Sequence, residues 1–268
     1  MFRFASFTLA AVAAACSAFA ESAYDDPIEA QVLSGWVMPN GDRMVALRLR
    51  LDPGWKTYWR APGDAGIPPE FDWSRSRNLE GASVSWPTPE VFHENGMRSI
   101  GYTRDVIIPI RIAPDEGDAP VRLRGEMHLG VCSDICMPHT LHFDATLDTD
   151  ETKPTPAIAA ALAERPYSAK EAGVTAATCR IEPIEDGLRI EARVDMPSAG
   201  GTEEMVIEPG RLDIWVSEPK THRSGGTVVA TSELMHVSGG AFALDRSDIR
   251  LTVIGTSHAV DIRGCTPG

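Results

Sequence analysis

The sequence predicts an all-β fold in which two β-sandwich domains stand in tandem and are joined by a short helical connector. Three observations support this: short segments in which apolar and polar residues alternate, turn residues between those segments, and one alanine-rich helical stretch in the middle. Regular short strands separated by turn signals are typical of β sandwiches. Residues 21–152 and 175–268 would form the two domains, each of ordinary size, with residues 153–174 as the connector.

The chain begins with a segment typical of a secretory signal peptide. Residues 1–20 contain one basic residue, Arg3, then a short apolar run that ends in Ala18-Phe19-Ala20. We expect cleavage after Ala20, which would remove Cys16 from the mature protein. No later apolar run is long enough to cross a bilayer, so we expect no membrane span in the mature chain.

The charge of the chain restricts the kinds of partner that it can bind. The formal net charge is −13, and it becomes −14 when Arg3 is removed with residues 1–20, which contain no acidic residue. Nucleic acids and anionic membranes both attract cationic surfaces. The composition therefore argues against both of these as partners.

The strands of the first domain follow from their alternation. Residues 28–33 and 44–51 alternate, and Asn40-Gly41 between them is typical of a hairpin turn. The polar, glycine-containing residues 91–102 are predicted as a loop. Further strands are predicted at residues 84–86, 106–112, 121–129 and 140–147, with an aromatic strand at 55–60. Cys132 and Cys136 therefore lie where two adjacent strands meet.

The connector and the second domain are predicted in the same way. Residues 157–165 form the clearest helix, with Pro156 at its start and Pro166 just beyond its end. Strands then resume at residues 179–182, 188–194, 212–216, 227–230, 249–254 and 258–263.

Four cysteines remain in the mature chain: Cys132, Cys136, Cys179 and Cys265. An even number in an exported protein favours disulfides over metal ligands. If neighbours pair, closing the long Cys179–Cys265 loop stabilises the fold by about 4.6 kcal/mol, against about 2 kcal/mol for the short Cys132–Cys136 loop. The long bridge is then a structural disulfide. The short bridge suits exchange, because strained or exposed disulfides are the easily reduced ones.

Two other uses of the short pair stay open. One is a small structural clip, and the other is a Cu(I) site that adds Met137 and His139, since thiolates and thioethers are soft ligands. The copper alternative would make the chain a periplasmic copper-binding or copper-tolerance protein. We found no phosphate-binding loop and no nucleophile motif, and expect no cofactor besides the disulfide.

Several segments, in order along the chain, resemble the periplasmic N-terminal domain of the DsbD/ScsB thiol:disulfide interchange family. They include Gly-Trp-Lys-Thr-Tyr-Trp-Arg at 54–60, Phe-His-Glu at 92–94, and Gly-Val-Cys-Ser-Asp-Ile-Cys-Met-Pro at 130–138. Residues 63–69, 86–89 and 101–102 add to the resemblance, which covers about residues 24–150. The second domain fits the ScsB-like branch, whose exported region has two immunoglobulin-like units.

The resemblance implies an immunoglobulin-like sandwich with a redox pair, Cys132 and Cys136, in a thiol–disulfide oxidoreductase component of the protein-disulfide reductase type. The segment with His93, Glu94, Asn95 and Met97 would form a cap that shields the pair, and Tyr58 and Trp59 would line the site. The cap departs from the family pattern, because no aromatic residue stands at its tip, and the cysteine spacing is shorter.

The resemblance also implies the partners. The family's membrane and thioredoxin-like domains have no counterpart in this sequence, so we expect a separate electron donor. That donor would be a thioredoxin-like periplasmic protein or a membrane electron-transfer protein, and the acceptors would be periplasmic disulfides.

Overall fold

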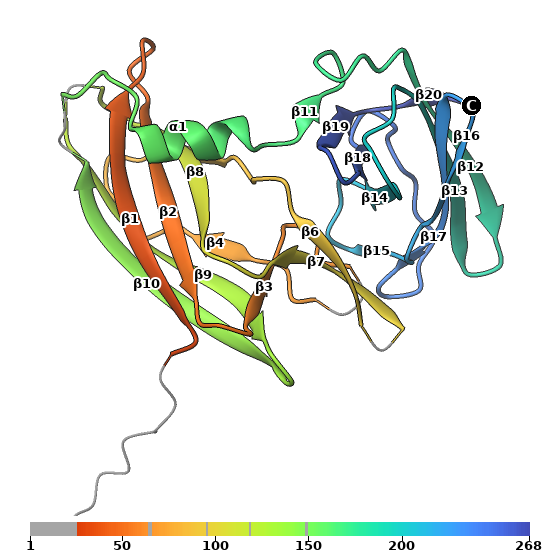
Figure 1. The fold of residues 1–268 in the computed structure, drawn as a ribbon, viewed down its shortest axis with the longest axis horizontal. Coiled ribbons are helices and arrows are strands. Elements are labelled where there is room, and N and C mark those ends of the chain that lie inside the picture. Colours follow the sequence, from red (N-terminus) through yellow and green to blue (C-terminus); the bar gives the residue numbers. More distant parts are fainter. Residues whose placement is uncertain (1–25, 64–65, 95, 118, 148–149) are drawn as a thin grey trace, which may run out of the picture.

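The computed structural model describes residues 26–63, 66–94, 96–117, 119–147 and 150–268, and it confirms the predicted fold class. The described chain forms four sheets in two β-sandwich-like bodies, with a short helix between them (Figure 1). The predicted signal peptide, residues 1–20, lies outside the described residues.

The first body consists of a four-stranded and a six-stranded sheet. In the first sheet the order is β1-β2-β8-β5, and in the second it is β10-β9-β3-β7-β6, with β4 beside β9. The strands are β1 Ile28–Val37, β2 Arg43–Leu51, β3 Lys56–Tyr58, β4 Glu70–Asp72, β5 Gly81–Val84, β6 Glu90–Glu94, β7 Met97–Tyr102, β8 Val106–Ala113, β9 Val121–Cys132 and β10 Cys136–Leu147.

The second body repeats this arrangement with a sheet of order β11-β19-β18-β14 and a sheet of order β15-β17-β13-β12-β20, with β16 beside β17. Its strands are β11 Tyr167–Ser168, β12 Ala176–Ile184, β13 Gly187–Asp195, β14 Glu204–Glu208, β15 Ile214–Val216, β16 Lys220–Ser224, β17 Thr227–His236, β18 Arg250–Ile254, β19 Ala259–Arg263 and β20 Thr266–Pro267.

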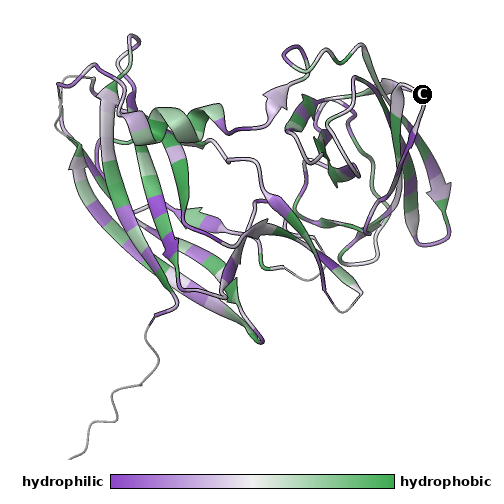
Figure 2. Ribbon diagram, viewed as in Figure 1, coloured by the Kyte–Doolittle hydropathy of each residue, from purple (hydrophilic) through white to green (hydrophobic). Residues whose placement is uncertain are grey.

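Alternation along the strands builds the core of each body. In β9, Val121, Leu123 and Met127 are buried while Arg122 and Arg124 are exposed, so one face packs inward and the other meets solvent. Figure 2 shows the same alternation as bands of apolar and polar residues along the strands. The sheets therefore form where the apolar period is two, as the sequence predicted.

The connecting helix α1, Pro156–Ala163, packs against the first body. Pro156 occupies the first turn, where its missing N–H costs nothing, and Ile158 is buried against Met44 and Ala46 of β2. No helix of the described chain has the length and hydrophobicity needed to cross a membrane.

One prediction about the first body was wrong. Residues 91–102 do not form a loop: they form most of the hairpin β6–β7, with Glu94 opposite Met97. Asn-Gly is a hairpin turn signal, and Gly96 has the positive φ, 78°, that such a turn requires. Strand position 101 requires glycine, because a Cβ there would lie 2.0 Å from the Thr57 carbonyl oxygen. The glycines thus mark a tight turn and a close strand approach.

Candidate redox site

Cys132 and Cys136 form a disulfide at the end of the β9–β10 hairpin. Cys132 is the last residue of β9 and Cys136 the first of β10, and the two are paired in register with Cα atoms 4.1 Å apart. Cys132 is completely buried, with 0% exposure, whereas Cys136 is exposed. An attacking group from solvent therefore meets the sulfur of Cys136 first.

Tyr58 lies beside both sulfurs. Its hydroxyl oxygen is 2.7 Å from Cys132 Sγ and 3.2 Å from Cys136 Sγ. Because a disulfide sulfur carries no hydrogen, the tyrosine hydroxyl is the donor. Burial, and then the negative charge of Glu94, raise the pKa of Tyr58, so the hydroxyl keeps its proton near neutral pH.

Two glycines leave room for the Tyr58 ring. A Cβ at Gly130 would lie 2.9 Å from one edge of the ring, and a Cβ at Gly66 would lie 2.8 Å from the other. Thr57 donates its hydroxyl to the Gly130 carbonyl at 2.9 Å, which fixes β3 against β9. The glycine just before the cysteine motif therefore makes room for the ring that reaches the sulfurs.

Lys56 connects the site to the β6–β7 hairpin. It is paired in register with Cys132, and its side chain forms an ion pair with Glu94 at the end of β6. Its Nζ also lies 5.5 Å from the centre of the Phe92 ring. Lys56 and Tyr58 are two positions apart in one strand, so their side chains leave the same face of the sheet. The hairpin end therefore lies close to the disulfide.

Residues 27–148, which contain this site, match the family described as thiol:disulfide interchange protein DsbD, N-terminal. The first domain belongs to the DsbD N-terminal family. The crystal structure of the N-terminal periplasmic domain of ScsB from Proteus mirabilis is similar over 91% of this chain and 95% of that one, with a TM-score of 0.68 and 21% identity. That likeness extends the shared fold to the second domain. No curated protein matches the chain.

The residues predicted to shield or line the site of this DsbD-type domain occupy different places. Tyr58 contacts the sulfurs, but Trp59 has 0% exposure and belongs to the core, because successive strand side chains point to opposite faces. His93 contacts Glu204 of the second domain, at 3.4 Å. Met97 is exposed at the hairpin end, and Asn95 lies outside the described residues. Lys56 was not predicted as a site residue. Its spacing of two residues from Tyr58 could have indicated it, because such a spacing places both side chains on one face of a strand.

Exposed apolar side chains flank the accessible sulfur. Ile135 is 71% exposed and Met137 is 39% exposed, and they are the chain neighbours of Cys136. Large apolar side chains exposed together often mark a protein-binding surface. The surroundings of Cys136 thus suit a transient protein partner.

The side chains predicted as Cu(I) ligands in the alternative interpretation lie on two opposite faces of the sheet. In β10, Met137 and His139 leave the sheet on the face opposite to the one Cys136 occupies. His139 lines a surface cavity together with Asp26 and Asp52. Among the described residues, no group of three or more His, Cys, Asp or Glu side chains is arranged to hold a metal ion.

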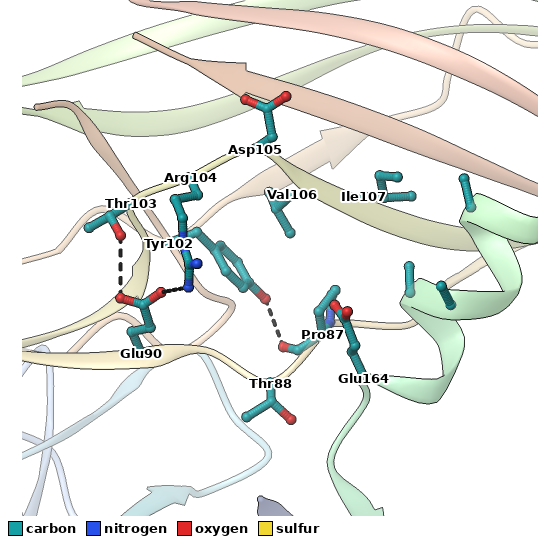
Figure 3. Close-up of a pocket in the computed structure, with 13 residues that line it drawn as sticks. Pro87, Thr88, Glu90, Tyr102, Thr103, Arg104, Asp105, Val106, Ile107 and Glu164 are labelled. Atoms are coloured by element: carbon teal, nitrogen blue, oxygen red, sulfur yellow. Dashed lines mark hydrogen bonds and ion pairs between the residues drawn. The ribbon is translucent and has the colours of Figure 1, made fainter. Parts of the chain in front are cut away.

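A separate cavity of about 450 Å³ lies between α1 and the β7–β8 turn (Figure 3). The buried Tyr102 hydroxyl donates to the Pro87 carbonyl oxygen there, at 2.8 Å, and Arg104 pairs with Glu90 at 3.1 Å. No cysteine lines this cavity, so it is separate from the Cys132–Cys136 disulfide.

The second disulfide, Cys179–Cys265, lies in the second domain. It joins β12 to the residues just before β20, and the two cysteines have a sequence separation of 86. Cys179 has 0% exposure, and its carbonyl oxygen accepts hydrogen bonds from Arg246 at 3.2 Å and from the Gly268 N–H at 3.3 Å. These contacts tie the end of the described chain to the core of this domain.

Proposed function

We propose that the protein carries out thiol–disulfide exchange and relays electrons through Cys132 and Cys136. The observation that carries this proposal is the pairing of one exposed and one buried cysteine, whose two sulfurs both lie within hydrogen-bonding distance of the Tyr58 hydroxyl. Membership of the DsbD N-terminal family supports it. The solved relative is a periplasmic domain, and we propose the periplasm as the location of this protein.

Electrons enter by two successive displacements. A partner thiolate attacks Cys136 Sγ, which forms a mixed disulfide and breaks the Cys132–Cys136 bond, so that Cys132 leaves as a thiolate. The Tyr58 hydroxyl, 2.7 Å from this sulfur, donates a hydrogen bond to the new negative charge. A second partner thiolate then attacks the partner sulfur of the mixed disulfide and releases Cys136. The partner is oxidised to a disulfide, and the protein gains two electrons and two protons.

Electrons leave by the reverse chemistry. The Cys136 thiolate attacks an acceptor disulfide, and the Cys132 thiolate then attacks Cys136 Sγ in the mixed disulfide. The Cys132–Cys136 bond forms again and the acceptor keeps both electrons as thiols. The donor class that the family suggests is a thioredoxin-like protein, and the acceptors are disulfides of other periplasmic proteins.

The test is reduction of the purified oxidised protein by reduced thioredoxin, followed by alkylation and mass spectrometry. We expect two new thiols at Cys132 and Cys136, while Cys179 and Cys265 stay joined. For trapping, the single variants are first treated with 5,5′-dithiobis(2-nitrobenzoate), which converts an accessible thiol to a mixed disulfide with thionitrobenzoate. A thioredoxin that lacks its resolving cysteine should then displace thionitrobenzoate from Cys132→Ala and form a stable mixed disulfide through Cys136, whereas Cys136→Ala, whose remaining Cys132 is buried, should form none. Failure of the wild-type protein to gain thiols, or trapping through Cys132, would contradict the proposal.

A further inference from the structure

Strand β15, Ile214–Val216, lies at the edge of its sheet and is free on its outer side. In that sheet it pairs with β17 alone, and at its two ends Asp213 and Ser217 each form a backbone hydrogen bond of 2.9 Å to residues 233–237. Because ladder bonds alternate along an antiparallel strand, the N–H and C=O groups of Ile214 and Val216 point away from β17. None of these four groups has a hydrogen-bond partner among the described residues.

A second free strand edge faces β15. In β14 the Met205 N–H donates to the Thr221 hydroxyl at 3.0 Å, so it points away from β18, the strand that β14 pairs with. The same alternation directs the backbone groups of Ile207 away from β18. A groove of about 390 Å³ is lined by Ile207, Ile214 and Val216 together. The groove therefore lies between two strand edges whose backbone groups are unpaired within the part of the chain that the structure describes.

Exposed apolar side chains gather at this groove. Of the seven large apolar side chains that are exposed in the described chain, three lie on or next to β15: Leu212, Trp215 and Val237. Leu212 and Trp215 line the groove, with Pro62 and Pro68 of the first domain opposite them. A cluster of exposed apolar side chains often marks a binding surface. The free edge is thus combined with an apolar surface.

The charged side chains of the groove are already paired. Each of the three guanidinium groups among its described lining residues binds a carboxylate: Arg60 binds Glu208 at 3.0 and 2.9 Å, Arg98 binds Glu204 at 3.0 Å, and Arg211 binds Asp213 at 2.9 and 2.6 Å. Glu218, the other acidic lining residue, lies 3.9 Å from Arg98. Because burying an unpaired charge is costly, the complement of this groove is an uncharged segment.

We propose that β15 binds an extended, uncharged peptide segment of a partner protein, which adds to the sheet as a further strand. Its backbone pairs with the free groups of Ile214 and Val216, and addition of a strand to a sheet edge is a recurring mode of peptide recognition. Side chains alternate between the two faces of such a strand. Those on one face pack against Trp215, and those on the other enter the groove beside Ile207.

The surroundings of the edge select a single segment over a second copy of this chain. The free edge lines a groove whose other residues come from β14 and from the first domain, including Pro62 and Pro68. A second copy would bring a whole sandwich, whose sheets lie about 10 Å apart, against those residues. An extended peptide brings one strand only. This site lies apart from the cysteine pair, and the inference does not depend on exchange at Cys136.

The experiment titrates the oxidised, isotope-labelled protein with blocked pentapeptides and follows its backbone amide signals by NMR. The peptides alternate threonine with one apolar residue, which is valine, leucine, phenylalanine or tryptophan. We expect at least one of them to bind saturably and to shift the amide signals of Ile214 and Val216. N-methylation of one alternate set of peptide amides should weaken binding at least about tenfold, whereas methylation of the other set should change it less than about twofold, because a strand pairs along one edge.

Two proline variants supply the matched comparison on the protein. Val216→Pro removes an N–H that has no partner in the described chain, and proline is tolerated on edge strands, so the fold should persist while peptide binding weakens at least about tenfold. Val84→Pro is the control. Val84 occupies the same kind of outward position on the edge strand β5, next to Ser85, whose N–H bonds the Pro109 carbonyl oxygen at 2.8 Å. This variant should bind the peptide as the wild type does.

Three results would overturn the inference: no peptide binds, both sets of methylated amides weaken binding equally, or Val216→Pro binds like Val84→Pro. If Val216→Pro does not fold, the methylated peptides decide the matter on the wild-type protein. Sedimentation of the wild-type protein tests the other occupant. A dimer that Val216→Pro converts to a monomer would assign the edge to a second copy of this chain, and would likewise overturn the proposal of a peptide partner.

Discussion

The two disulfides of this protein occupy opposite environments. Cys132–Cys136 spans a separation of 4 positions at a hairpin end, with one cysteine exposed and a tyrosine hydroxyl beside both sulfurs. Cys179–Cys265 spans 86 positions and ties a buried strand residue to the last residues of the chain. Because loop-closure entropy grows with loop length and exchange requires access, the long bridge suits stability and the short one suits reactivity.

The largest expected effect separates the bridges by function. Cys136→Ala should lower the rate of disulfide exchange with thioredoxin by at least about 1000-fold, because the remaining cysteine of the pair, Cys132, is buried and has no partner sulfur with which to form a disulfide. Cys265→Ala should leave that rate within about twofold. Thiol quantification during turnover with thioredoxin gives both rates. Exchange by the Cys136→Ala protein at a wild-type rate would remove the distinction.

The next effect separates the bridges by stability. The double variant Cys179→Ala/Cys265→Ala should lower the free energy of unfolding of the second domain by about 2–5 kcal/mol, whereas Cys132→Ala/Cys136→Ala should cost about 2 kcal/mol or less in the first. Denaturant unfolding followed by circular dichroism measures both. A larger loss from the short bridge would contradict the comparison.

A buried ion pair in the second domain makes the stability of that domain depend on pH. Burial raises the pKa of Glu203, but hydrogen bonds from Arg223 and the Ala199 N–H outweigh it and leave the pKa below its usual value. A lowered carboxyl pKa stabilises the fold above the unfolded value of about 4.3, and this contribution disappears as the pH falls through the folded pKa.

Glu203→Gln should therefore cost about 2 kcal/mol at pH 7 and clearly less at pH 3. Urea unfolding of the wild-type and variant proteins at both pH values gives the difference. A cost that is equal at the two pH values would show that the charge of Glu203 is not the cause.

The smallest effect tests the hydroxyl beside the reactive bridge. Tyr58→Phe should slow reduction of Cys132–Cys136 about tenfold, since the leaving Cys132 thiolate loses a hydrogen-bond donor. Tyr102→Phe is the matched control, because its buried hydroxyl donates to Pro87 and not to a sulfur. The control should lose about 1 kcal/mol of stability with no change in the reduction rate. Equal reduction rates in the two variants would exclude the role of Tyr58.

Local patterns in the sequence determined much of this molecule. Period-two alternation in stretches such as Val121–Cys132 predicted the strands, and Pro156 and Pro166 predicted the helix between the two bodies. The spacing of the cysteines predicted a short pair at a strand junction and a long pair in the second domain. These features depend on neighbours along the chain, so they can be read without a fold.

The tertiary structure alone decided how the site works. Tyr58 meets Cys132 across 74 positions, and Arg98 meets Glu204 across 106, so both contacts depend on strand order and domain packing. The exposure of Cys136 and the burial of Cys132 follow from the same packing, although the two residues share one motif. Residues 91–102 were predicted as a loop because glycine weakens a strand pattern, and only the neighbouring Thr57 backbone explains why Gly101 is there. Sequence periodicity records which face of a strand is apolar, but not which distant side chain will lie against it.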